Sequence, residues 1–244
     1  MKISVIIPTL NEASNIKKLI THMRMHGGKD LHEIIVSDGG SSDNTKQLAA
    51  NAGAKVVLSE IKGRASQMNL GVKHATGDVL YFVHADTLPP IEFIAEIQQA
   101  VLNNKKAGCF RFRFDSDKKM LAFNSYFTRF NSIISGGGDQ SLYIEKKLFH
   151  ELGGFDESCV IMEDFELVDR LKKNSKGLHI IPKNIIVSAR KYTNNSYLRV
   201  NFANVLVIFL YRMGVDQGKL LKFYKSFLRP YSGDMNLVED EGVN

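Results

Sequence analysis

The sequence predicts an α/β fold, in which a mostly parallel sheet carries helices on both faces and a helical extension follows at the C-terminal end. Strand-like and helix-like segments alternate up to about Phe114, as in repeated strand–helix–strand units. The first strand, residues 3–7, is almost wholly β-branched, which is typical of a strand buried on both faces. A length of 244 residues and a hydrophobic content of 44% suffice for one domain with a substantial core.

The first half of the chain supplies most of the expected sheet. Pro8 ends the first strand because proline has no N–H to donate to a neighbouring strand. Pro89 and Pro90 suit the start of a helix. The expected strands are residues 3–7, 33–37, 55–58, 79–83 and 107–114. The expected helices are residues 12–26, 43–51, 65–74 and one that follows Pro90.

The pattern changes after Asp115, where we place a soft boundary within one compact unit. The expected helices here are residues 119–134, 146–152 and 163–173. The expected strands are residues 141–144, 179–181 and 185–187, and glycines at 136–138 and 153–154 end two of the helices. Residues 1–192 then form the main domain, residues 193–231 a basic helical extension, and residues 232–244 an acidic tail expected to be disordered.

The positive charge of the chain is concentrated near its C-terminal end. The net charge is +6, yet residues 183–230 contain nine lysines and arginines and one acid, Asp216. Such a segment suits an anionic partner, either phosphate groups or an acidic membrane face. Tryptophan is absent, and aromatic residues are not interleaved with basic ones, so we do not expect a nucleic-acid partner.

The cysteines and the apolar runs indicate a cytoplasmic protein. Cys109 and Cys159 lie far apart and lack partners at metal-binding spacing, so we expect buried thiols in a reducing compartment. The apolar run after Lys2 is too short for a signal peptide, and no stretch reaches the roughly 18 apolar residues of a spanning helix.

Polar residues follow the first two expected strands directly. Pro8, Thr9, Asn11 and Glu12 come after the first strand, and Asp38 ends the second. Ligands of α/β sheets bind where parallel strands end, so Asp38 is a candidate acceptor for a hydrogen bond from a base or a sugar. The alternative is a strand–turn–helix connection with well-placed caps and no ligand.

A second candidate segment precedes the third helix. Gly63 permits close approach of a ligand, and Arg64 at the helix start can meet a phosphate or a base carbonyl, with Asn69 near the next turn. The alternative is an ordinary solvated arginine.

The fourth strand is followed by His84, Ala85 and Asp86. If the strand continues through them, His84 and Asp86 point to the same face, because side chains alternate. A carboxylate and an imidazole can hold a divalent cation whose other ligands are phosphate oxygens. The alternative is a polar strand end.

Acids open the helix at residues 163–173. Asp164 is a candidate general base, with Glu163 beside it. Acids in a first turn also stabilise the positive end of a helix, and spacing alone does not separate the two roles.

Taken in order, these motifs resemble family 2 glycosyltransferases with the GT-A fold, whose sheet is Rossmann-like. The resemblance covers roughly residues 2–192, and it is closest to a small single-domain bacterial branch with His-Ala-Asp at the metal triplet. The matching segments are Pro8 to Glu12, the turn at Asp38, Gly63-Arg64, His84-Ala85-Asp86, Gly153 to Asp156 and Glu163-Asp164.

The resemblance implies a role for each matching residue. Residues 1–114 would be the nucleotide-binding half and residues 115–192 the acceptor half. Asp86 would bind Mn²⁺ or Mg²⁺, and Asp164 would be the catalytic base. The residues implied near the donor sugar and acceptor are Gly138, Asp139, Gln140, Glu163 and Arg190. The residues implied in nucleotide binding are Pro8, Thr9, Asn11, Glu12, Asp38, Gly63, Arg64, Asn69 and Ala85.

The sequence departs from the family pattern at two places, which bear on the metal ligands and on processivity. His84 replaces the first acid of the usual Asp-x-Asp triplet, which leaves its role as a metal ligand open. The Gln-x-x-Arg-Trp motif of processive synthases is missing, and residues 188–192 stand near its place. We therefore expect a non-processive enzyme.

The expected activity is inverting, metal-dependent transfer of a sugar from a nucleotide-sugar donor, with UDP the expected nucleotide, to an acceptor hydroxyl. One alternative is a sugar nucleotidyltransferase, although that class carries a glycine-rich loop after the first strand, where this chain has none. Another is a nucleotide-sugar-binding protein without turnover, which would not need both Asp86 and Asp164.

The C-terminal extension allows two interpretations. Residues 198–213 are apolar at 12 of 16 positions, which predicts a buried helix. Four basic residues then fall on one side of the next helix: Lys219, Lys222, Lys225 and Arg229. They form either a solvated face of two packed helices or a surface that meets anionic lipid or a lipid-linked acceptor, which would place the protein at the inner membrane face.

Overall fold

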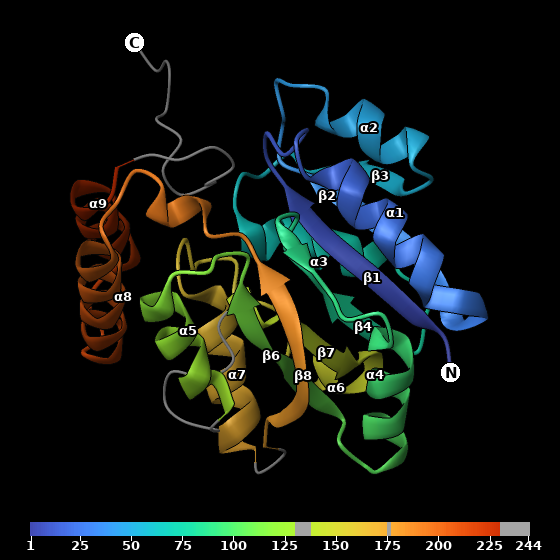
Figure 1. Ribbon diagram of the computed structural model, residues 1–244. Helices are drawn as coiled ribbons and strands as arrows, with labels where there is room; N and C mark the ends of the chain where they lie inside the picture. Colours follow the sequence, from blue (N-terminus) through green and yellow to red (C-terminus); the bar gives the residue numbers. More distant parts are fainter. Residues whose placement is uncertain (130–137, 175–176, 230–244) are drawn as a thin grey trace.

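The computed structural model describes residues 1–129, 138–174 and 177–229, and within these residues eight strands form one mixed sheet (Figure 1). The strand order is β3-β2-β1-β4-β7-β6-β8-β5. The strands are β1 Ile3–Thr9, β2 Leu31–Asp38, β3 Lys55–Leu58, β4 Val79–Phe82, β5 Thr87–Leu88, β6 Ala107–Phe114, β7 Leu142–Glu145 and β8 His179–Val187. Parallel pairing joins β1 to β2 and β4, β2 to β3, and β6 to β8, so the expected mostly parallel sheet is confirmed.

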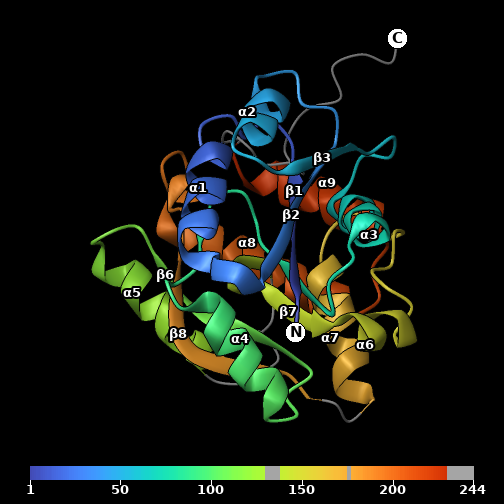
Figure 2. The ribbon, with the colours of Figure 1, turned by 90° about the vertical axis from the view of Figure 1, so that its right-hand side faces the viewer.

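Helices cover both faces of the sheet, as the sequence predicts (Figure 2). One face packs against α1 Ile16–Gly27, α2 Thr45–Asn51 and α4 Phe93–Leu102. The other face packs against α3 Arg64–His74, α6 Lys146–Glu151 and α7 Glu163–Lys173. Alternation along β1 sends Ile3, Val5 and Ile7 to the first face and Ile6 to the second, which explains why this strand is apolar throughout.

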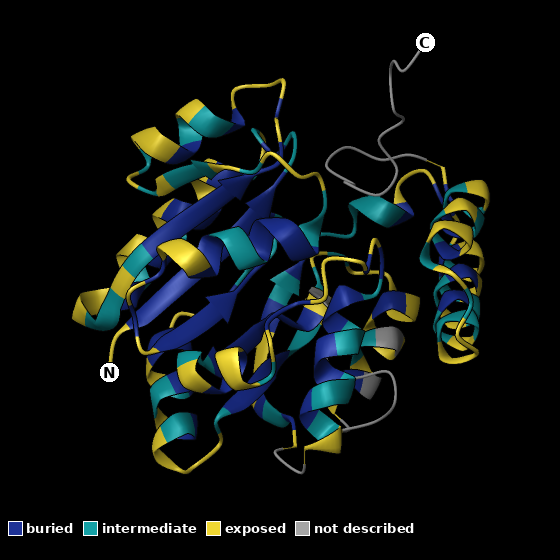
Figure 3. Cartoon of the chain, turned by 180° about the vertical axis from the view of Figure 1, so that it is seen from behind, coloured by how far each residue is buried: buried dark blue, intermediate teal, exposed yellow. Residues whose placement is uncertain are grey.

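A smaller third core joins the C-terminal helices to the rest of the molecule. It lies between α5 Lys119–Tyr126, the 3₁₀ turn Arg190–Tyr192, α8 Tyr197–Arg212 and α9 Gln217–Phe227. The two C-terminal helices form an antiparallel pair at one edge of the molecule (Figures 1 and 3). In the described part of the chain, no helix is long and apolar enough to cross a membrane.

Several expected elements differ in extent. The first helix begins at Ile16, because residues 12–15 form a turn closed by N–H groups of Asn15 and Ile16 on the Glu12 carbonyl. The two brief strands expected at 179–187 are one strand, β8, whose pairing with β6 continues past a register shift after Phe110. The helix expected at 119–134 ends at Tyr126 and a 3₁₀ turn follows to Arg129; the remainder, residues 130–134, lies outside the described residues.

Two further expectations were wrong in ways that matter for the site and the surface. β4 ends at Phe82, and residues 84–86 form a turn before the short strand β5, which the sequence did not suggest. The helix α8 is not buried all round, because its outer face exposes a row of large apolar side chains. The expected disordered tail lies outside the described residues.

Candidate active site

The carboxyl ends of β1, β2 and β4 meet at one edge of the sheet. Thr9 pairs with Asp38 across the parallel strands, and Ile6 pairs with Phe82. The Gly39 amide also donates to the Thr9 carbonyl at 2.9 Å. Residues far apart in sequence are thus brought together where α/β sheets place ligands.

Asp38 is buried in the turn that follows β2. Its carboxylate accepts hydrogen bonds from Thr9 Oγ1 at 3.0 Å, the Gly40 amide at 3.1 Å, and the Ser41 amide and hydroxyl at 2.8 and 2.6 Å. A carboxylate offers about four acceptor positions, so these bonds use its capacity. Asp38 therefore orders this turn, and its contact with a nucleotide stays a prediction.

The loop after β1 is fastened to the loop after β2 through Asn11. The Asn11 backbone is left-handed, with φ of 54°. Its amide donates to Ser41 Oγ at 2.9 Å, and its side-chain oxygen accepts from the Ser42 amide at 2.9 Å. The two strand-end loops thus form one pre-organised wall. An asparagine tolerates this backbone conformation better than most residues.

Arg190 joins two carboxylates that come from different parts of the sheet edge. Its guanidinium donates to both oxygens of Glu12, at 2.9 and 2.5 Å, and lies 3.0 Å from Asp86 Oδ2. The Glu12 side chain is only 5% exposed and that of Asp86 16% exposed. We name this cluster of Glu12, Asp86 and Arg190 the carboxylate clamp.

The turn after β4 presents His84 and Asp86. The argument from strand alternation does not apply to them, since β4 ends before His84. Burial lowers the pKa of His84 to about 4, with help from the nearby Arg64 charge, so its imidazole is neutral near pH 7. Burial raises the pKa of Asp86 to about 6, and the Arg190 charge opposes this shift.

A divalent cation fits this turn only with ligands from elsewhere. Among the residues that the structure describes, no three histidine, cysteine, aspartate or glutamate side chains are grouped to hold a metal. The Asp86 carboxylate and the neutral His84 imidazole are suitable donor types for Mn²⁺ or Mg²⁺. The site thus suits a cation whose remaining ligands are phosphate oxygens and water.

Arg64 pairs with Glu163 across the opposite wall. Arg64 Nε lies 2.8 Å from Glu163 Oε1, and the Glu163 side chain is only 1% exposed. Arg64 begins α3 after Gly63, whose φ of 135° favours glycine. A Cβ at Gly63 would meet open space, so the backbone angle, and not crowding, calls for glycine here.

Asp164 lies in the first turn of α7 and is buried. Met162, the residue just before α7, has a left-handed backbone with φ of 69°, which is a strained conformation for methionine and is found at functional sites. A cavity of about 200 Å³ opens beside Asp164. Its lining includes Arg64, His84, Asp139, Gln140, Glu163, Asp164 and Lys191. Five of these residues were expected near the metal, the donor sugar or the acceptor: His84, Asp139, Gln140, Glu163 and Asp164. Arg64 was expected at the nucleotide and lines the same cavity.

The segment Gly138–Gln140 contributes one exposed and one buried side chain to this cavity. Asp139 is exposed. The Gln140 amide donates to the Phe110 and Thr128 carbonyls at 3.1 and 3.3 Å, so it holds the segment against β6. Gly138 stands at the first described position after the gap.

Asn69 makes structural hydrogen bonds, and its contact with a nucleotide stays a prediction. Its side-chain nitrogen donates to the Phe155 carbonyl at 2.9 Å, and its oxygen accepts from the Phe155 amide at 3.0 Å. The same nitrogen lies 2.8 Å from Glu157 Oε1. Asn69 thus fastens the loop before α7 to α3. Ala85 is buried in the turn between His84 and Asp86.

Residues of the C-terminal helices also line the cavity, which the sequence did not predict. Asn204 and Val207 of α8 and Tyr224 of α9 form part of its wall. The spacing of apolar residues in α8 and α9 predicts packed helices, and it does not predict that they line a pocket. Lys191 also lines the cavity and likewise carries no local signal in the sequence. Its neighbour Arg190 was expected near the donor sugar, but its contact with Glu12, 178 positions away, was not.

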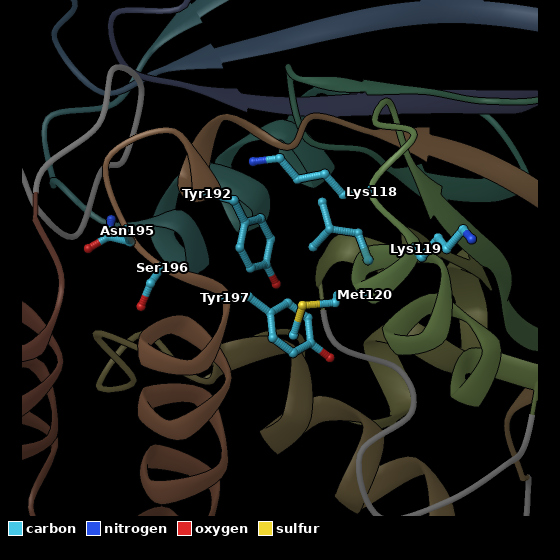
Figure 4. Close-up of a pocket in the computed structure, with 8 residues that line it drawn as sticks. Lys118, Lys119, Met120, Tyr192, Asn195, Ser196 and Tyr197 are labelled. Atoms are coloured by element: carbon cyan, nitrogen blue, oxygen red, sulfur yellow. The ribbon is translucent and has the colours of Figure 1, made fainter.

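Two larger cavities flank the 3₁₀ turn Arg190–Tyr192. One of about 520 Å³ includes Arg190, Ser188 and Asp115 in its lining. The other, of about 360 Å³, lies between α5 and the start of α8. Figure 4 shows the Tyr192 and Tyr197 rings facing this second cavity beside Met120. Tyr192 borders both, so the two cavities adjoin at this ring.

The fold, with its site at the carboxyl ends of parallel strands and on the first turn of α7, is the GT-A fold of glycosyltransferases. Solved structures support this class at low sequence identity. The chain matches a mannosyltransferase of Pyrobaculum calidifontis, solved with GDP-Man and Mn²⁺, at TM-score 0.63 and 21% identity, over 88% of this chain and 64% of that one. It matches glucosyl-3-phosphoglycerate synthase of Mycobacterium tuberculosis, solved with Mg²⁺ and UDP, at TM-score 0.62 and 20% identity, over 88% and 80%.

The chain belongs to glycosyl transferase family 2, whose sequence profile matches residues 4–151. A second profile, described as glycosyltransferase-like family 2, matches residues 88–226. The probable glycosyltransferase YdaM of Bacillus subtilis is 27% identical over 73% of this chain and 48% of its own length. The dolichol-phosphate mannosyltransferase of Pyrococcus furiosus is 35% identical over 42% of this chain and 31% of its own. The chain thus spans half or less of the length of these relatives.

Proposed function

We propose that this chain transfers a sugar from a UDP-linked donor to an acceptor hydroxyl, with inversion at the anomeric carbon. The observation that carries the proposal is the cavity in which Asp164, His84, Asp139 and Arg64 meet. Its lining residues His84 and Lys191 are sequence neighbours of the carboxylate clamp, so a donor diphosphate at the clamp would have its sugar near Asp164.

Two members of the clamp would bind the diphosphate, Arg190 directly and Asp86 through a metal ion. Asp86, with His84 beside it, would hold Mn²⁺ or Mg²⁺, which would neutralise negative charge on the diphosphate when bound. Arg190 already lies 3.0 Å from Asp86, and it would exchange a carboxylate partner for hydrogen bonds to phosphate oxygens when the diphosphate binds. The solved relatives with GDP-Man and Mn²⁺, or with UDP and Mg²⁺, support this assignment.

Asp164 would act as the general base in a single displacement. Its carboxylate takes the proton from the acceptor hydroxyl while that oxygen attacks the anomeric carbon. The bond from the anomeric carbon to the diphosphate breaks, and the electron pair leaves with the diphosphate, which Arg190 stabilises. Attack from the side opposite the diphosphate inverts the anomeric carbon without a covalent enzyme intermediate.

The test is Asp164→Asn, compared with Asp169→Asn on the same helix. Asp169 is ion-paired with Arg212 at 3.2 Å and does not line the cavity, so it is a matched control. Transfer to water, measured as UDP release from a UDP-sugar with Mn²⁺, serves as the assay while the acceptor is unidentified. We expect Asp164→Asn to slow release about 10²–10⁴-fold with donor affinity nearly unchanged. Unchanged UDP release in Asp164→Asn would show that Asp164 only stabilises the helix. If the wild-type protein binds the donor but releases no UDP, the chain is a binding protein and not an enzyme.

A further inference from the structure

The outer face of α8 exposes a continuous row of large apolar side chains. Its members follow one another at steps of three or four residues, so they share one face of the helix. They are Leu198, Phe202, Val205, Phe209 and Met213, and each exposes between 56% and 72% of its surface. The opposite face of α8 is buried in the third core through Val200, Ala203 and Val207. Only the exposed face is therefore available to an outside partner.

The row continues onto α9 through aromatic contacts. The Phe202 and Phe227 ring centroids are 5.6 Å apart, and those of Phe227 and Phe223 are 4.7 Å apart. These contacts join the two helices into one apolar surface. We call the row on α8, together with Phe223 and Phe227, the outer hairpin face. Exposed residues mark this helix pair at the edge of the molecule in Figure 3.

The charges around the outer hairpin face are almost all positive. Exposed basic side chains on or beside it include Arg199, Lys219, Lys222 and Arg229. Between residues 197 and 229 the sequence has a single acid, Asp216. The Asp216 carboxylate accepts from the Lys219 amide at 3.1 Å and so caps the start of α9. An apolar row with a cationic rim is the charge pattern that binds anionic lipid headgroups.

We propose that the outer hairpin face docks on an anionic phospholipid bilayer, with α8 lying along the surface and its apolar row inserted below the headgroups. Self-association through this face would bring Lys219 and Lys222 of two copies together, so a second copy is the weaker occupant. A bilayer satisfies both features of the surface at once: acyl chains meet the apolar row, and headgroup phosphates meet the lysines and arginines.

Docking has a consequence for the candidate site, and this step rests on the proposed function. The inner side of the same helix lines the Asp164 cavity through Asn204, Val207 and Ile208. A helix with its side chains is about 10–12 Å across, so the cavity would lie about one helix diameter from the headgroups. An acceptor hydroxyl carried on a lipid would be within reach of such a site.

Vesicle binding tests the docking without donor or acceptor. The full chain is sedimented with vesicles of phosphatidylcholine containing phosphatidylglycerol, and with vesicles of phosphatidylcholine alone. We expect binding to the anionic vesicles that weakens with salt, and a loss of about tenfold or more in Phe202→Ser/Phe209→Ser. Lys219→Glu/Lys222→Glu should remove the preference for phosphatidylglycerol. The matched control is Leu58→Ser/Leu102→Ser, which changes two exposed apolar side chains of β3 and α4 and should bind as the wild type does.

A single-tryptophan reporter keeps the test valid if the serine variant folds poorly. The chain contains no tryptophan, so Phe209→Trp places one fluorophore on the row and Leu102→Trp places one on the control site. Anionic vesicles should shift the emission of the first to shorter wavelength and leave the second unchanged. Absent vesicle binding, equal shifts in both variants, or concentration-dependent dimers lost in Phe202→Ser/Phe209→Ser would each overturn the proposal. Because UDP binding is measured separately, failure here leaves the proposed function untouched.

Discussion

At the scale of single residues, one guanidinium keeps two carboxylates in place. Arg190 contacts Glu12 and Asp86, which are both largely shielded from water. Two acids so close would repel each other without it, and Glu12 already contributes to the raised pKa of Asp86. Arg190 therefore stabilises two buried acids at the place where the proposed function puts a metal and a diphosphate. Under the proposed function, this arrangement ties the stability of the fold to the groups that would bind the donor.

Arg190→Ala should destabilise the protein and weaken donor binding together. Removing one partner of a buried ion pair typically costs about 3–5 kcal/mol in the free energy of unfolding. The matched change is Lys183→Ala, whose ion pair with Glu96 at 3.7 Å is exposed and should be worth about 0–1 kcal/mol. Denaturant unfolding and calorimetric titration with UDP and Mn²⁺ measure the two effects. Unaltered UDP affinity in Arg190→Ala would contradict the role at the diphosphate.

The cysteines should be inert in the folded protein. Both Cys109 and Cys159 are buried free thiols, as the sequence predicts, and burial raises their pKa values to about 12 and about 11. The reactive thiolate is therefore scarce at pH 8. A thiol-specific chromogenic reagent should label neither residue in native protein and both after denaturation. Rapid labelling of the native protein would show that one thiol is accessible.

At the scale of elements, loops carry the site and helices hold the loops. The loops after β1 and β2 are joined through Asn11, Asp38 and Ser41, and Asn69 of α3 fastens the loop that leads to Asp164. Side-chain bonds to backbone groups therefore fix the positions of segments that lack regular structure. The geometry of the candidate site therefore depends on hydrogen bonds made outside it.

Asn69→Ala tests whether Asn69 supports the loop before α7 or contacts the nucleotide. We expect a loss of about 1–3 kcal/mol in the free energy of unfolding, because partly buried hydrogen bonds to Phe155 are left unmade. UDP affinity should stay within about twofold, since Asn69 faces the loop and not the cavity. Gln47→Ala is the control, because Gln47 makes an exposed bond within α2 and its loss should be nearly neutral. A large drop in UDP affinity at unchanged stability would restore the nucleotide contact expected from the sequence.

The helix α8 has two different faces, and composition alone does not separate them. An apolar content this high predicts burial all round, yet only Val200, Ala203 and Val207 reach the core fully. The helix packs at the edge of the molecule, where one side has no neighbouring element in the described structure. The position of α8 depends on how the whole chain packs, and this packing cannot be predicted from the composition of the helix.

At the scale of the whole molecule, local pattern predicted most elements, and long-range pairing decided the rest. The strand at 107–114 and the helix at 163–173 are found where they were predicted, because each has one clear periodicity, and so is the short apolar strand at 55–58. β8 reads as two strands, since Pro182 interrupts the pattern, but pairing with β6 carries it through. The ends of strands and the start of α1 depend on turns that sequence periodicity does not show.

The candidate site was predictable as residues but not as contacts. The order of motifs pointed to Asp86, Asp164, Arg190 and the strand ends, and the structure places these around one edge of the sheet. The ion pairs between Arg190 and Glu12 and between Arg64 and Glu163 join distant segments and leave no local mark in the sequence. The contribution of α8 and α9 to the cavity wall arises in the same way.

A crystal structure with UDP and Mn²⁺ tests the central claim most directly. The claim is that the carboxylate clamp holds the donor diphosphate and that Asp164 faces the donor sugar from across the cavity. We expect the diphosphate oxygens to share the metal with Asp86 and to accept hydrogen bonds from Arg190, with the Asp164 carboxylate on the open side of the cavity. A diphosphate bound away from Asp86 and Arg190, or an Asp164 carboxylate turned out of the cavity with Glu163 in its place, would contradict the account.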